Sequence, residues 1–137
     1  MKKIKTYFLI FLIIPISYFF AACQKEKTGT DGIVVPGNIS LEVHAVHHNW
    51  DVSGITIYLE KNVTDFPGKD STIYDIKGIA DGYGIFTFEH LHPGNYYVYA
   101  SGYDAIWGTN VIGYMPAVIN SNTVTDNELK ITLIVSE

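Results

Sequence analysis

The chain has 137 residues, which leaves room for one domain of ordinary size once a leader is removed. Three of its nine lysines lie in the first five positions, so the remainder carries six lysines against fourteen acidic residues. The resulting net charge of −8 argues against a nucleic-acid partner, and the lack of arginine disfavours anionic substrates.

The first 22 residues have the layout of a secretory signal peptide. A basic head, Met1 to Lys5, precedes an apolar run from Tyr7 to Ala22 that contains Pro15 and ends in two small residues. A helix over this run would be about 24 Å long, shorter than the ~30 Å hydrocarbon core of a bilayer. The sequence therefore predicts a signal peptide over residues 1–22 rather than a membrane span.

The lone cysteine follows this run directly, and the segment Phe20-Ala21-Ala22-Cys23 resembles a bacterial lipobox. The resemblance implies a palmitate-bearing lipoprotein held on a membrane through lipid on Cys23. The polar residues 24–27 resemble the signal that sends some lipoproteins across the outer membrane. We expect an exported protein on the outer membrane, surface-exposed or periplasm-facing, with residues 23–37 as a flexible tether.

The rest of the chain predicts short strands. Ile39, Leu41, Val43 and Ala45 alternate with more polar residues, as in a half-buried strand, and the same period recurs over residues 55–60. Further strands are predicted near Thr72 to Ile76, Ile85 to Glu89, Tyr96 to Ser101 and Leu129 to Val135. No helical stripe of three turns occurs. We predict an all-β domain over residues 38–137, a Greek-key sandwich of about seven strands.

The segment from Ala80 to Ala100 resembles the core motif of carboxypeptidase regulatory-like domains, which are similar to transthyretin in fold. The motif joins an acidic-glycine turn, an aromatic strand, a Pro-Gly turn and an alternating strand. Its residues here are Asp81, Gly82, Phe86, Phe88, Leu91, Pro93, Gly94, Tyr96 and Val98. All have structural explanations: the aromatic and aliphatic side chains enter the core, and Gly94 permits a positive φ. The motif therefore predicts fold and not chemistry.

Five histidines raise the question of a metal site. The weak candidates are His44, His48, His90 and His92, since imidazoles two apart on a strand can hold one ion. No acidic or cysteine cluster stands beside them at a recognised spacing. We therefore expect solvated surface histidines and no cofactor.

A second candidate is an aromatic platform. Tyr58, Tyr97 and Tyr99 occupy polar-face positions of their strands, and Trp107 lies in a loop. Such rings can stack on sugars or anchor a protein partner. The alternative is that the tyrosines only pair across strands, where tyrosine is common.

No catalytic motif occurs in the sequence, so we expect no enzyme. The sequence favours a lipid-anchored envelope module for adhesion, assembly or ligand binding, with an unidentified protein or glycan partner. The alternative is a metal- or carbohydrate-binding periplasmic lipoprotein. The fold itself supplies only analogy, because sandwiches of this kind have many unrelated functions.

Overall fold

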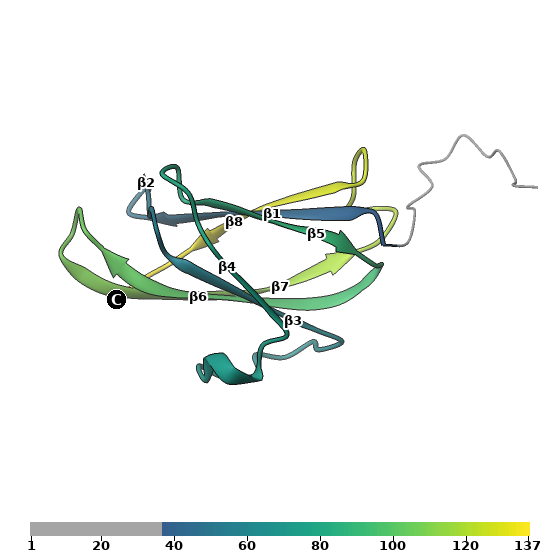
Figure 1. Ribbon diagram of the computed structural model, residues 1–137, viewed down its shortest axis with the longest axis horizontal. Coiled ribbons are helices and arrows are strands. Elements are labelled where there is room, and N and C mark those ends of the chain that lie inside the picture. Colours follow the sequence, from purple (N-terminus) through teal and green to yellow (C-terminus); the bar gives the residue numbers. More distant parts are fainter. Residues whose placement is uncertain (1–36) are drawn as a thin grey trace, which may run out of the picture.

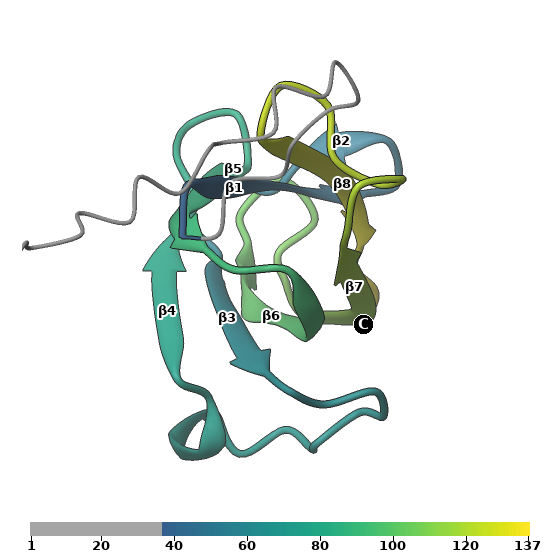
Figure 2. The ribbon, with the colours of Figure 1, turned by 90° about the vertical axis from the view of Figure 1, so that its right-hand side faces the viewer.

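The computed structural model describes residues 37–137, which form a sandwich of two four-stranded sheets (Figures 1 and 2). The strands are β1 (Ile39–His47), β2 (Trp50–Asp51), β3 (Thr56–Lys61), β4 (Ile76–Ile79), β5 (Ile85–Leu91), β6 (Gly94–Asp104), β7 (Thr109–Ile119) and β8 (Glu128–Ile134). The predicted all-β sandwich is confirmed. The predicted signal peptide, lipid site and nearly all of the tether lie outside the described residues.

In the first sheet β1 is central. β1 pairs antiparallel with β5 along one edge and parallel with β8 along the other. The short β2 pairs with the end of β1, on the same edge as β5. The second sheet has the order β4-β3-β6-β7 and is antiparallel throughout. Within residues 37–137 the one helical segment is a 3-10 turn, and no helix there could cross a bilayer.

The alternation read from the sequence decides which side chains meet between the sheets. Leu41 and Val43 of β1 belong to the same core as Ile57 and Leu59 of β3, and all four are essentially inaccessible to solvent. Val98 of β6 completes this layer. Burial of such side chains contributes roughly 1.5 to 3 kcal/mol each, so the core fixes the register of both sheets.

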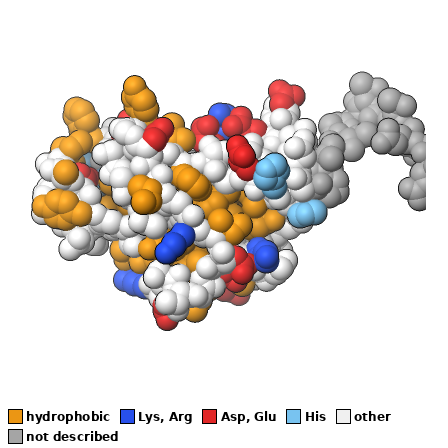
Figure 3. Space-filling view, in the orientation of Figure 1, with side chains coloured by type: hydrophobic (Ala, Val, Ile, Leu, Met, Phe, Trp, Pro, Cys, Tyr) orange, Lys and Arg blue, Asp and Glu red, His pale blue; other side chains and the backbone are white. Residues whose placement is uncertain are grey.

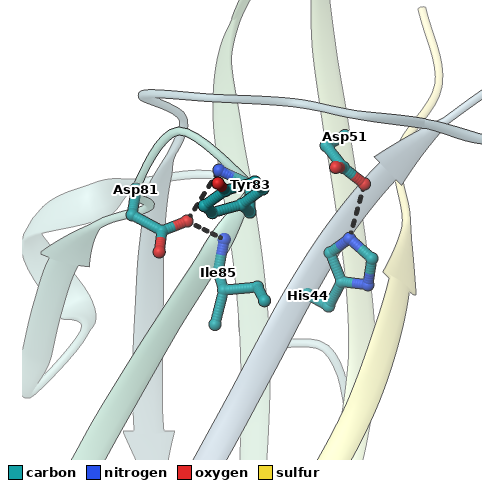
Figure 4. A network of polar contacts seen from close by, with 5 residues as sticks. All are labelled: His44, Asp51, Asp81, Tyr83 and Ile85. Atoms are coloured by element: carbon teal, nitrogen blue, oxygen red, sulfur yellow. Dashed lines mark hydrogen bonds and ion pairs between the residues drawn. The ribbon is translucent and has the colours of Figure 1, made fainter.

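Most of the predicted motif is structural in the way expected. Leu91, Tyr96 and Val98 are buried, and Phe88 is 2% exposed. Asp81 accepts hydrogen bonds from the backbone N–H groups of Tyr83 and Ile85, which closes the β4–β5 turn (Figure 4).

Two details of the motif differ from the prediction. Phe86 is only partly buried, and its ring lies over Gly78, where a Cβ would overlap it. The glycine that the β4–β5 turn requires is Gly84, with φ of +71° and a Cβ position 2.7 Å from the Ala45 carbonyl, rather than Gly82. Gly94 has a positive φ of +159°, as predicted, and a left-handed residue that the prediction did not include is His90, at a bulge opposite β1.

Two strand predictions need correction. The segment Thr72 to Ile76 is not a strand: Ser71–Ile73 form a 3-10 turn capped by Asp70, and β4 begins only at Ile76. The long strand β7 was missed, because Gly113 and Pro116 interrupt its pattern. Proline is tolerated there because β7 lies at the edge of its sheet.

The sandwich has two distinct ends (Figure 1). The described chain enters β1 at Gly37, and the β7–β8 loop lies at this same end because β8 runs parallel to β1. The opposite end carries the β1–β2 turn (residues 48–49), the β4–β5 turn (80–84) and the β6–β7 turn (105–108). We call this opposite end, with the flanking Trp50, Tyr103 and residues 135–137, the distal tip.

Candidate functional site

The distal tip exposes large apolar side chains, which Figure 3 shows at the left-hand end. They lie in or directly beside the three turns of the tip. Their exposed fractions are 59% for Trp50, 72% for Tyr83, 59% for Tyr103, 63% for Ile106 and 50% for Trp107. Single exposed apolar residues are normal, but a group of aromatic rings at one end is typical of a binding surface.

A buried polar pair lies directly beneath this surface. His47 and Asp104 are each 2% exposed, and Nδ1 of His47 lies 2.9 Å from a carboxylate oxygen of Asp104. Burial by itself raises the pKa of Asp104, but hydrogen bonds from His47 and from two backbone N–H groups outweigh it, so this pKa lies below its usual value. Asp104 is therefore ionised at neutral pH, and Nδ1 of His47 donates to it.

Asp104 also shapes the β6–β7 turn. Its second carboxylate oxygen accepts from the backbone N–H groups of Ile106, at 2.8 Å, and Trp107, at 3.3 Å. Its own carbonyl accepts from Gly108, which has φ of +68°. One carboxylate thus joins His47 on β1 to the turn that displays Trp107, and so links the two sheets at the tip.

The side chains of His47 and His48 lie close together, although neighbouring residues of a regular strand point to opposite faces. His48 and Asn49 both have left-handed backbone, with φ of 49° and 67°, which folds the chain back into β2. As a result, the rings of His47 and His48 have centroids 4.3 Å apart, and the Trp107 ring lies 4.7 Å from that of His48.

These histidines line an open pocket of about 470 Å³ together with Asn49, Val135 and Glu137. Glu137 arrives there because β8 runs parallel to β1 and ends at the same end. Sequence reasoning missed His47, Asp104 and Glu137 as partners, since their separation along the chain leaves no spacing signal.

The four histidines named from the sequence do not form one site. His44 bonds to Asp51 at 2.8 Å on the exposed face of the first sheet (Figure 4). His90 and His92 flank Leu91 at the opposite end of the sandwich from His48. Of the four, only His48 belongs to the pocket at the distal tip.

The predicted tyrosine platform is covered. Tyr58 and Tyr99 are cross-strand neighbours on the outer face of the second sheet, as expected, but Tyr97 and Tyr99 are buried, at 8% and 4% exposed. Phe66 and Tyr74, from the segment between β3 and β4, pack on them. Of the two alternatives, cross-strand pairing is therefore the one observed, for Tyr58 and Tyr99. Trp107 is exposed, at the distal tip.

Phe66 and Tyr74, which cover these tyrosines, are themselves held by further contacts. The Tyr74 hydroxyl donates to the carbonyl of Gly68 at 2.7 Å, and the Phe66 ring stacks on Tyr114 with centroids 4.2 Å apart. Burial, followed by the nearby Tyr99, raises the pKa of Tyr74 to about 12. The outer face of the second sheet is therefore a second small hydrophobic cluster.

No protein-family model and no curated protein matches the chain. Among solved structures it is similar to the pilus 2b backbone protein of group B streptococcus, at 12% identity and a TM-score of 0.52, over 72% of this chain and 40% of that one. A variant of BcpA, the major pilin subunit of Bacillus cereus, is similar at 15% identity and a TM-score of 0.50, over 75% and 31%. The chain thus spans less than half of either pilin, and the likeness shows the fold alone.

Proposed function

We propose that this chain is a non-enzymatic, lipid-anchored module of the cell envelope that binds a protein partner through its distal tip. The observation that carries the proposal is the group of exposed aromatic side chains at the end farthest from Gly37. In a domain attached through residues 23–37, this is the end farthest from the point of attachment.

A protein partner fits the tip better than a glycan. Tryptophan and tyrosine are enriched among the residues that dominate protein interfaces. Ile106 in the β6–β7 turn is 63% exposed and offers apolar contact area without a ring to stack on a sugar. The rigid support from Asp104 limits the conformational entropy that the β6–β7 turn would lose on binding.

The anchor is tested by Cys23→Ser. We expect the wild-type chain to incorporate labelled palmitate and to lose its leader, and the variant to incorporate none, because the thiol is the acceptor of the lipid. Labelling of cells followed by gel autoradiography measures this. A wild-type protein that takes up no label and keeps residues 1–22 would refute lipid anchoring.

The tip is tested by crosslinking in intact cells. A photo-crosslinking residue placed at Tyr103 should form an adduct with one discrete protein, and the same residue at Ser121, exposed in the β7–β8 loop at the opposite end, should not. In a protein that also carries Trp50→Ser, the yield of the adduct from position 103 should fall at least tenfold. This is the effect expected when an aromatic interface residue contributes more than about 1.4 kcal/mol to the binding free energy. Equal adducts from both sites, adducts with polysaccharide, or none at all would contradict a protein-binding tip.

A further inference from the structure

Three side chains with metal-binding atoms converge in the pocket at the distal tip. His47, His48 and Glu137 each offer one ligand atom, and these atoms lie within 4.8 Å of one another. Ligand atoms around a tetrahedral zinc ion are about 3.3 Å apart, given bonds of about 2.0 to 2.1 Å. The His48 and Glu137 side chains are exposed and can rotate to close this difference, whereas His47 is fixed.

His47 is oriented as metal-bound histidines commonly are. Its Nδ1 donates to the buried carboxylate of Asp104, which leaves Nε2 as the nitrogen for a ligand. No hydrogen bond within residues 37–137 uses Nε2, and no fully buried side-chain nitrogen there lacks a partner. Nε2 of His47 therefore reaches solvent, and His47 is one of the residues that line the pocket.

We infer that the distal tip is a binding site for a divalent first-row transition-metal ion, with zinc as the expected occupant, held by His47, His48 and Glu137. Two imidazoles and one carboxylate suit such ions better than calcium or magnesium, which take oxygen ligands. Three protein ligands leave a fourth position for water or for a donor atom from another molecule.

This inference reverses the expectation from the sequence, which found no acidic companion for the histidines. The companion is Glu137, brought to the β1–β2 turn by the parallel β8. Metal binding here does not depend on the proposed protein partner, because all three ligands belong to this chain. It is measured on the purified chain alone, so its failure and the failure of the crosslinking experiment are distinguishable.

The experiment is a titration of the full, chelator-treated chain in detergent with zinc chloride, followed by calorimetry and by the melting temperature. We expect one zinc ion per chain, and a melting temperature raised by several degrees at a hundredfold excess over Kd. His48→Asn and Glu137→Gln should each weaken binding at least tenfold. Asparagine is chosen because it tolerates the left-handed backbone at His48.

The matched control is His90→Asn, which also removes an exposed imidazole from a left-handed residue, at the other end of the sandwich. It should leave zinc affinity unchanged. Cobalt in place of zinc should give visible absorption bands that His48→Asn diminishes and His90→Asn does not. Absence of one-to-one binding, or binding that His90→Asn weakens while His48→Asn and Glu137→Gln do not, would overturn the inference.

Discussion

Phe88→Ala is expected to lower the free energy of unfolding by about 3 to 5 kcal/mol. Phe88 lies between the two sheets, 2% exposed, and packs edge-on against Phe86 with ring centroids 4.9 Å apart. Alanine would leave a cavity that β1, held on both edges by β5 and β8, cannot collapse to fill. Chemical denaturation followed by tryptophan fluorescence measures the loss.

The control for this prediction is Glu89→Ala, the next residue of β5, whose side chain is exposed. It should change the free energy of unfolding by less than about 0.5 kcal/mol. A Phe88→Ala variant as stable as Glu89→Ala would show that Phe88 does not fill the core.

Asp104→Ala is expected to cost roughly 2 to 4 kcal/mol, because it leaves His47 and two backbone N–H groups at the tip without their acceptor. Asp104→Asn keeps one acceptor oxygen and should cost less. Denaturation of the three proteins at pH 7 gives the comparison. Equal stability of Asp104→Ala and wild type would mean that water replaces the carboxylate at no cost.

The lowered pKa of Asp104 also predicts how stability depends on pH. Because the carboxyl ionises more readily when folded, its contribution is complete above the unfolded-state pKa of about 3.9 and is lost as pH falls through the folded-state pKa. The stability difference between wild type and Asp104→Asn should therefore shrink as pH falls below about 4. A difference that stays the same or grows as pH falls below about 4 would contradict this assignment.

The sequence predicted the strands whose alternation is regular. β1 and β3 follow a period of two, so their inner faces could be assigned residue by residue. In β5 a bulge near His90 interrupts this period, and in β6 both faces are buried between Tyr96 and Ala100. β7 could not be recognised, because an edge strand accepts Pro116 and an inner-face Gly113 that packs against the backbone of Ile134. The alternation of apolar and polar residues reflects the burial of one face of a strand, and the sequence of an edge strand is less constrained by pairing and burial.

The candidate site was harder to predict than the fold. Alternation placed Tyr97 and Tyr99 on the outer face correctly, but it could not show that Phe66 and Tyr74 cover that face. The pocket at the distal tip depends on β8 running parallel to β1, which brings Glu137 to His48. Local patterns contain no information about which distant strands become neighbours. Only the tertiary structure therefore assembles the site.

A mechanical force applied between the tether and the distal tip would act on few structural elements. If the chain is held at Cys23, as we propose, a pull at Trp50 runs along the backbone of β1, because Gly37 and Trp50 lie at opposite ends of that strand. A β-strand is already close to its full length, so this force need not peel β5 or β8 away from it. A pull at Trp107 instead reaches β1 through the packing between the sheets and through the bond from Asp104 to His47. The β1–β2 hairpin is thus the part of the tip that can bear load while the sandwich stays intact.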